Sequence, residues 1–193
     1  MTMNIKLQSE NPGILETLQL LTVLKTPNIA ECSAALILGE NHKSKLEAVC
    51  SANLLQRFYF VPQKQMFYMI PLDIYIKGVL SYPSETRHYL WCKYVRMIAS
   101  ILNKAAQSYN MGETTSALKL FDYYRAPIHD LLLCTDLKGL FAKTTRKLTK
   151  IIAIANDMLH HRFTSEEMKS IEIVYNCTMD LEEISVVSEK EEM

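Results

Sequence analysis

Histidine and cysteine are the first side chains to test for chemistry, because both can bind metals and cysteine can act as a nucleophile. His129 stands five residues before Cys134, so the two could meet across a loop, but no acid or nucleophile motif accompanies them. His160 and His161 are adjacent, and on a helix they point about 100° apart, so they do not chelate a metal as a pair. The sequence therefore predicts structural or exposed roles for these side chains.

Motifs of common enzymes are missing from the sequence. It contains no G-x-S-x-G, no H-E-x-x-H, no G-x-G-x-x-G and no Gly-Lys-Ser/Thr phosphate loop. Glycine, which phosphate loops need for positive φ, occurs only five times in 193 residues. We therefore predict a protein that is not an enzyme and has no cofactor or metal.

A row of basic residues is the strongest positive signal. Lys143, Arg146, Lys147 and Lys150 recur at spacings of three and four, which places them on one side of a helix. The opposite side is an apolar stripe that includes Leu148, Ile151, Ile152, Ala155, Met158 and Leu159. Each phosphate that a protein contacts releases condensed counterions, so basic rows of this kind suit nucleic acids. A solvated helix face is the alternative interpretation.

A second predicted helix carries more positive charge. Arg87, Lys93, Arg96 and Lys104 lie within residues 84–109, where Glu85 is the sole acid. Arg162 extends the charge of the first row beyond Asp157. We predict that RNA phosphates are contacted by Lys143, Arg146, Lys147, Lys150, Arg87, Lys93 and Arg96.

The net charge of zero conceals an asymmetry along the chain. Residues 180–193 hold six acids and one base, which leaves 20 basic and 15 acidic residues in the rest of the protein. The body of the protein is therefore mildly basic and its C-terminal tail is acidic. This distribution fits either an anion-binding surface or an ordinary solvated surface with a solubilising tail.

An aromatic segment, "RFYFVPQKQMFYMIPLDIYI" at residues 57–76, invites three interpretations. It is broken by Pro71 and Asp73, well short of the roughly 20 apolar residues of a membrane helix, so we expect no membrane insertion. Aromatic rings could stack on bases, or could lie in a subunit interface. Because Val61, Met66, Met69 and Ile70 are interleaved with the rings, we expect most of them in a core. The rings are Phe58, Tyr59, Phe60, Phe67, Tyr68, Tyr75, Tyr82 and Tyr89.

Cysteine usage indicates the redox compartment. The five cysteines are scattered and odd in number, and no secretory signal pattern precedes them, so we expect reduced thiols and a cytoplasmic protein. They are Cys32, Cys50, Cys92, Cys134 and Cys177.

Periodicity and scarce glycine predict a mostly α fold of about eight helices, an all-α class with at most one short hairpin, at Phe58–Ile70. Eight helices are expected, at residues 13–25, 29–38, 44–58, 72–80, 84–109, 114–125, 128–134 and from 136 or 140 to 162, and Thr164 offers the cap of a further helix. We predict an N-terminal extension at 1–12, one helical domain at 13–179 or two lobes meeting near 58–83, and a disordered acidic tail at 180–193.

In overall pattern, from about Gly13 to Tyr175, this helical chain with a basic body and reduced cysteines resembles the helical silencing suppressors of closteroviruses. The resemblance implies a viral protein that binds small double-stranded RNA without sequence preference and forms homo-oligomers. No family residue is carried over, because the resemblance includes no diagnostic motif. A helical protein–protein interaction module without nucleic-acid binding is the alternative.

Overall fold

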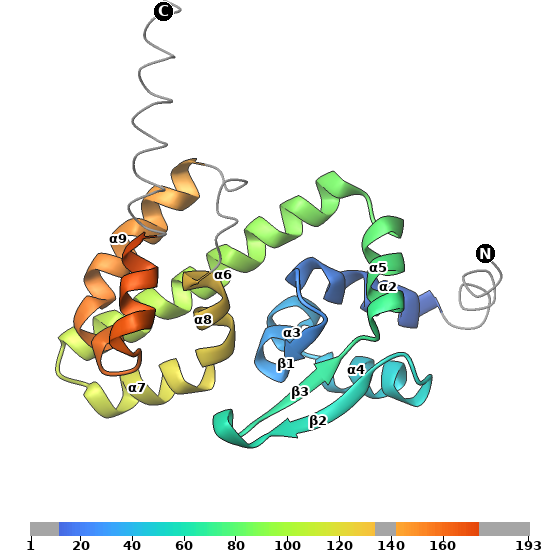
Figure 1. Cartoon of the computed structure of the whole chain (residues 1–193), viewed down its shortest axis with the longest axis horizontal. Helices are drawn as coiled ribbons and strands as arrows, with labels where there is room; N and C mark the ends of the chain where they lie inside the picture. The colour runs from blue at the N-terminus through green and yellow to red at the C-terminus, as the bar shows by residue number, and fades with distance from the viewer. Residues whose placement is uncertain (1–11, 134–141, 174–193) are drawn as a thin grey trace, which may run out of the picture. The chain divides into compact units, whose positions relative to one another are not determined.

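Helices dominate the fold, as predicted, and one small sheet accompanies them in the N-terminal half (Figure 1). The computed structural model describes residues 12–133 and 142–173. The chain divides into two compact units between Tyr94 and Val95, inside helix α6 (Ser84–Asn110). This division lies beyond the 58–83 region considered for two lobes. The predicted extension, apart from Pro12, and the predicted acidic tail lie outside the described residues.

Short helices and a sheet form the first unit. Its apolar side chains, including the fully buried Leu21, Ile29 and Leu46, make the core of this unit. Its helical elements are α2 (Pro12–Leu21), the 3-10 turn η1 (Thr22–Leu24), α3 (Glu31–Leu38), α4 (His42–Ser51), the 3-10 turn η2 (Val61–Gln63) and α5 (Leu72–Ser81).

The sheet has three antiparallel strands in the order β1-β3-β2. These are β1 (Asn28–Ala30), β2 (Gln56–Phe60) and β3 (Gln65–Met69). The predicted hairpin is confirmed as β2 and β3, in which Phe58 faces Phe67. Strand β1 was not predicted. Its residue Ile29 pairs with Tyr68, so helix α3 starts at Glu31 and not at Ile29.

Helix α4 ends earlier than residue 58, where the sequence pattern placed its end. Asn53 takes a left-handed conformation with φ 55° and the Leu54 N–H donates to the Val49 carbonyl, which closes the helix. Asparagine tolerates this conformation better than most residues. The chain then straightens into β2 at Gln56.

Helices alone make up the described part of the second unit. They are the C-terminal part of α6, α7 (Thr114–Tyr123), α8 (Arg125–Leu132), α9 (Ala142–His160) and residues 165–173. The sequence pattern placed the break between two of these helices at residues 126–127, before and at Pro127. The break falls instead at Tyr124, and Pro127 lies in the first turn of α8, where proline is tolerated. Phe121, Leu102, Ile128 and Met158 are fully buried in this unit.

The expectation that most aromatic side chains of residues 58–89 lie in a core is wrong. Tyr68 is buried at 6% exposure, whereas Phe58, Phe60 and Tyr89 are exposed and Tyr59 remains 55% exposed. Phe67, Tyr75 and Tyr82 are half-buried. The two faces of the sheet differ: Phe58 pairs with Phe67 and Phe60 with Gln65, on the face opposite the buried Ile29 and Tyr68.

Two further predictions concern residues that the structure describes in part. Cys32, Cys50 and Cys92 are free thiols, while Cys134 and Cys177 lie outside the described residues. Among the helices at 12–133 and 142–173, none combines the length and the apolar character needed to cross a membrane.

Candidate nucleic-acid interface

Helix α9 presents its basic row to solvent. Arg146, Lys147 and Lys150 are exposed. On the other side of the helix Leu148, Ile151, Ala155, Met158 and Leu159 are buried. Lys143 belongs to the first turn of α9, and its side chain is outside the described residues. The amphipathic pattern of the sequence thus places three of these cations where a ligand can reach them.

Helix α6 carries a second polar row within the second unit. Arg96, Ser100, Asn103, Gln107 and Asn110 follow one another at spacings of three and four, so they share one side of the helix. Asn103 is half-buried and the other four are exposed. The exposed Lys104 flanks this row.

The two rows meet at one hydrogen bond. The Nδ2 of Asn110, at the end of the α6 row, donates to the carbonyl oxygen of Ile154 at 3.2 Å. Ile154 is one helical turn beyond Lys150 and so continues the α9 row. Beside it the rings of Tyr109 and His161 lie 5.8 Å apart. The end of the α6 row therefore contacts α9 at Ile154, one turn beyond Lys150.

Arg87 has a structural contact that the sequence did not indicate. Its Nη1 donates to the Val79 carbonyl at 2.7 Å, and its side chain is half-buried. Nine residues, or two and a half helical turns, separate it from Arg96, so the two point to opposite sides of α6. Arg87 is therefore not part of the candidate interface. Lys93 is exposed and belongs to the first unit.

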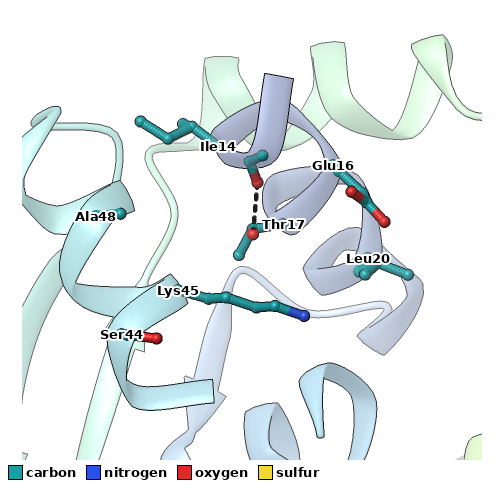
Figure 2. A pocket seen from close by; sticks show the side chains of 8 residues that line it. Ile14, Glu16, Thr17, Leu20, Ser44, Lys45 and Ala48 are labelled. Carbon is teal, nitrogen blue, oxygen red and sulfur yellow. Dashed lines mark hydrogen bonds between the residues drawn. The ribbon is translucent and has the colours of Figure 1, made fainter. Parts of the chain in front are cut away.

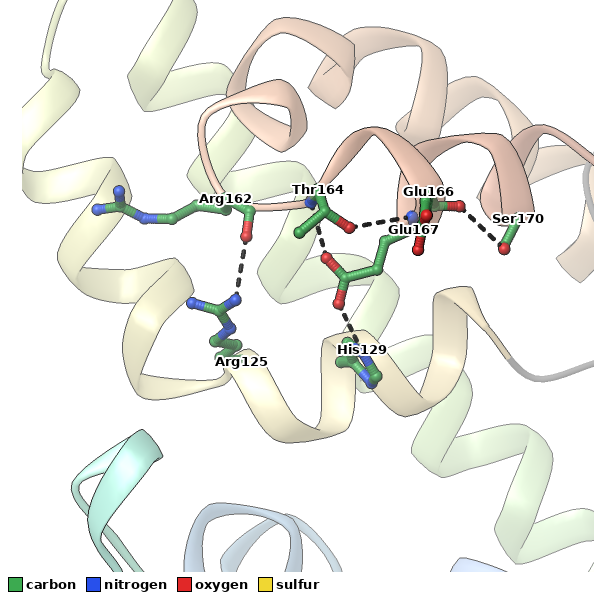
Figure 3. Close-up of polar contacts among 7 residues, drawn as sticks. All are labelled: Arg125, His129, Arg162, Thr164, Glu166, Glu167 and Ser170. Carbon is green, nitrogen blue, oxygen red and sulfur yellow. Dashed lines mark hydrogen bonds and ion pairs between the residues drawn. The ribbon is translucent and has the colours of Figure 1, made fainter.

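The Arg162 side chain also has a partner within the protein. Its Nε lies 2.8 Å from Oδ1 of Asp122, and its Nη2 donates to Oδ2 at 3.0 Å. Its carbonyl oxygen accepts a hydrogen bond of 3.1 Å from Nη2 of Arg125 (Figure 3). Arg162 thus links the end of α9 to α7 and α8 and does not extend the basic row.

His129, considered with Cys134 for nucleophilic chemistry, has other partners in the structure. Its Nε2 lies 3.3 Å from Oε1 of Glu167, and its ring stacks on Phe163 at 5.8 Å and 13°. Cys134 lies outside the described residues. His160 and His161 are exposed. Within residues 12–133 and 142–173, no three His, Cys, Asp or Glu side chains come close enough to hold a metal ion.

A shallow hollow of 230 Å³ lies between α2 and α4 (Figure 2). Three of its four polar side chains have hydrogen-bond partners within the protein, and the fourth is the exposed Glu16. Thr17 donates to the Gly13 carbonyl at 2.7 Å, Lys45 to the Leu38 carbonyl at 3.1 Å, and Ser44 to the Asn41 carbonyl at 3.1 Å. Ligand sites are usually larger than this and hold convergent polar groups. We therefore favour the basic rows as the functional surface.

Comparison with known proteins yields no relative: no family model matches the chain, and neither a curated protein nor a solved structure shows significant similarity.

Proposed function

We propose that this protein binds double-stranded RNA without sequence preference and without catalysis, through the second unit. The interface consists of the two converging rows, with Arg146, Lys147 and Lys150 on α9 and Arg96 and Lys104 on α6. The observation that carries the proposal is the Asn110–Ile154 hydrogen bond, because it joins the end of the α6 row to the helix that carries the α9 row.

The chemistry of the rows fits a duplex backbone. Lysine and arginine side chains bind phosphates, and A-form RNA is recognised mainly by shape and by phosphate and 2′-hydroxyl contacts. Ser100, Asn103 and Gln107, on the α6 row, can both donate to and accept from 2′-hydroxyl groups. Asp157, seven residues after Lys150, places a negative charge on the same side and marks the end of the basic row.

The resemblance to closteroviral suppressors supports a biological role for such binding. A protein that holds short duplexes without reading their bases sequesters the small RNAs of a host silencing pathway. The proposed role of this protein is thus that of a viral suppressor of RNA silencing in the cytoplasm. Its basic body, with 20 basic and 15 acidic residues before residue 180, is consistent with this role.

A charge-reversal experiment tests RNA binding. Lys147→Glu combined with Lys150→Glu should weaken binding to short duplex RNA equally for unrelated sequences. Each lost phosphate contact should lower the log–log salt slope by about 0.9, the value for B-DNA. Fluorescence anisotropy over a salt series measures both quantities. The matched control is Lys119→Glu with Lys169→Glu, because these exposed lysines lie on other helices of the same unit.

The double control variant should bind as the wild type does. The proposal fails if the wild type shows no duplex binding at low salt. It also fails if the control weakens binding as much as the α9 variant, since the effect would then reflect overall charge alone.

A protein–protein interaction module is the second candidate, favoured by the outer side of α5. Leu72, Ile76 and Leu80 recur every four residues and are 64%, 49% and 80% exposed. The inner side of α5 rests on η1, where an added Cβ at Gly78 would lie 2.8 Å from Cγ2 of Thr22. Helices with exposed apolar stripes commonly dock into partner grooves.

This candidate is tested with Ile76→Asp combined with Leu80→Asp. The variant should fold normally, because both side chains are exposed. It should bind duplex RNA as the wild type does if the basic rows carry the function. Two results together would favour the interaction module. The wild type would bind no RNA, and a partner protein that cross-links to the wild type would not cross-link to the variant.

A further inference from the structure

Strand β2 leaves one edge of the sheet open (Figure 1). Its sole partner among the described strands is β3, and all five of its residues are exposed. Proteins usually protect such edges with proline, lysine or a bulge. Residues Gln56–Phe60 contain no proline and a single charged residue, Arg57, and their register with β3 runs unbroken from Gln56↔Met69 to Phe60↔Gln65. The edge is therefore suited to accept another strand.

We propose that β2 pairs antiparallel with β2 of a second copy of this chain, about a two-fold axis at Phe58. The two sheets then join into one continuous sheet. This inference goes beyond RNA binding and does not depend on it.

The proposed register brings all of β2 into the pairing. With Phe58 on the axis, Arg57 faces Tyr59 of the second copy and Gln56 faces Phe60 of the second copy. In an antiparallel strand, only every second residue directs its backbone N–H and C=O groups away from β3. In this register, residues that face each other are both odd or both even in number. The outward N–H and C=O groups of one copy therefore meet the outward groups of the other. All five residues of β2 take part in the ladder.

Charge selects the same register. Arg57 is the sole charged residue of β2. A two-fold axis at Arg57 would place two guanidinium groups opposite each other, and like charges directly opposite destabilise a sheet. An axis at Tyr59 would move Arg57 opposite Val61, which lies in η2 after the strand has ended. The axis at Phe58 instead places each Arg57 beside a tyrosine ring, a favourable cation–π arrangement.

Aromatic packing also favours pairing at Phe58. In one chain the Phe58 and Phe67 rings stack at 5.8 Å, and the Phe60 and Phe67 rings meet edge to face at 5.6 Å. Phe58 and Phe60 nevertheless remain 39% and 40% exposed. Opposed residues of an antiparallel pair have Cβ atoms about 4.5–5.5 Å apart, so a second Phe58 would extend this cluster across the axis.

Sedimentation velocity on the full chain without RNA tests association. The wild type should form a dimer whose population rises with protein concentration. Phe58→Lys places two ammonium groups at the axis and should leave a monomer with the wild-type helical circular dichroism. The matched control, Leu80→Lys, introduces the same charge at an exposed apolar residue of α5 and should remain dimeric.

Cysteine cross-linking tests the register. Cross-linking of the wild type measures the background from its native cysteines. Phe58→Cys should form an intermolecular disulfide under mild oxidation. Gln56→Cys and Phe60→Cys should each link poorly alone and should link to each other when mixed. Because these three residues are exposed, the cysteine variants also test the proposal if Phe58→Lys fails to fold.

A wild type that stays monomeric at every concentration would overturn the proposal. So would association that survives Phe58→Lys, or dissociation caused by Leu80→Lys, which would place the interface on α5. Equal self-linking at positions 56, 58 and 60 would reject the register. Because no RNA is present, each of these results leaves the RNA-binding proposal standing.

Discussion

Glu167 caps one helix and contacts another through the two oxygens of a single carboxylate (Figure 3). Its Oε2 accepts the Thr164 N–H at 2.7 Å, and its Oε1 lies 3.3 Å from Nε2 of His129 in α8. In return, the Glu167 N–H donates to Oγ1 of Thr164 at 3.2 Å. This reciprocal capping box fixes the start of the helix at residue 165 and ties that helix to α8.

The capping carboxylate gives a pH prediction. The hydrogen bond from the Thr164 N–H, aided by Thr164 Oγ1 and His129, lowers the pKa of Glu167 below its ordinary value of 4.5. A group with a depressed folded pKa stabilises the fold above its unfolded pKa, and this contribution is lost as the pH falls through the folded pKa. Wild type should therefore exceed Glu167→Gln in unfolding free energy at neutral pH, with the difference shrinking below pH 4.5.

Urea unfolding of both proteins across this pH range measures the difference. Glu166→Gln is the matched control, because Glu166 is an exposed neighbouring carboxylate. A wild-type advantage over Glu167→Gln that stays constant or grows on acidification would contradict the capping role.

Two tyrosines on the hairpin should differ sharply on truncation. Tyr68→Ala removes a ring that is 6% exposed, and a buried aromatic truncation typically costs about 3–5 kcal/mol. Tyr59→Ala removes a ring that is 55% exposed, and such surface changes usually stay within about 0.5 kcal/mol. Denaturant unfolding at a protein concentration that keeps the chain monomeric compares them. Tyr59 and Tyr68 lie on the same face of the sheet, so similar losses would mean that this face is as well packed at the edge strand as at the central strand.

Gly78 should resist substitution for steric reasons. A Cβ added there would lie 2.8 Å from Cγ2 of Thr22, closer than real Cβ contacts allow. Overpacking of this kind typically costs about 1–3 kcal/mol, which exceeds the roughly 0.5–1 kcal/mol that alanine gains over glycine in a helix. Gly78→Ala should therefore lower the melting temperature.

Thr22→Ser provides the rescue for this variant. It removes Cγ2 but keeps the hydroxyl that donates to the Gln19 carbonyl at 2.7 Å. The double variant Gly78→Ala with Thr22→Ser should recover most of the lost stability in thermal melts followed by circular dichroism. Equal melting temperatures for the single and double variants would place the strain elsewhere.

Thiol reactivity should follow burial. Cys32 and Cys92 are buried and should resist alkylation in the native protein, whereas Cys50 is half-buried and should react slowly. Burial raises the pKa of the Cys50 thiol, so less reactive thiolate is present at neutral pH. Mass spectrometry after timed alkylation identifies each site. Under denaturing, non-reducing conditions all five cysteines of the chain should titrate as free thiols.

Long amphipathic helices were predictable because each carries several turns of one repeating pattern. Helix α6 was expected at 84–109 and spans Ser84–Asn110. The hairpin was predictable from its aromatic strands around Pro62. Strand β1 was not, because its three residues, Asn28–Ala30, are too few to show a period of two. The exposure of Phe58 and Phe60 could not be predicted either, since it depends on which face of the sheet is buried.

The candidate interface was predictable in part. The exposure of Arg146, Lys147 and Lys150 follows from helical periodicity, which the sequence shows directly. The hydrogen bond of Arg87 to the Val79 carbonyl could not be predicted, because it depends on how α5 and α6 are connected, and no local pattern encodes that contact. The Asp122–Arg162 pair joins residues of α7 and the end of α9, and its long sequence separation hides it in the same way.

The pairing of β1 with β3 has a consequence for how the chain folds during synthesis. Ile29 leaves the ribosome well before its partner Tyr68, and β2 and β3 can close locally through their short turn. Hairpins form in about 1–10 μs, whereas joining distant segments carries an additional loop-closure entropy. Strand β1 cannot pair before β3 has been made, and we expect the local hairpin to form first. The N-terminal strand is thus the last part of its sheet to become ordered, although it is the first to be made.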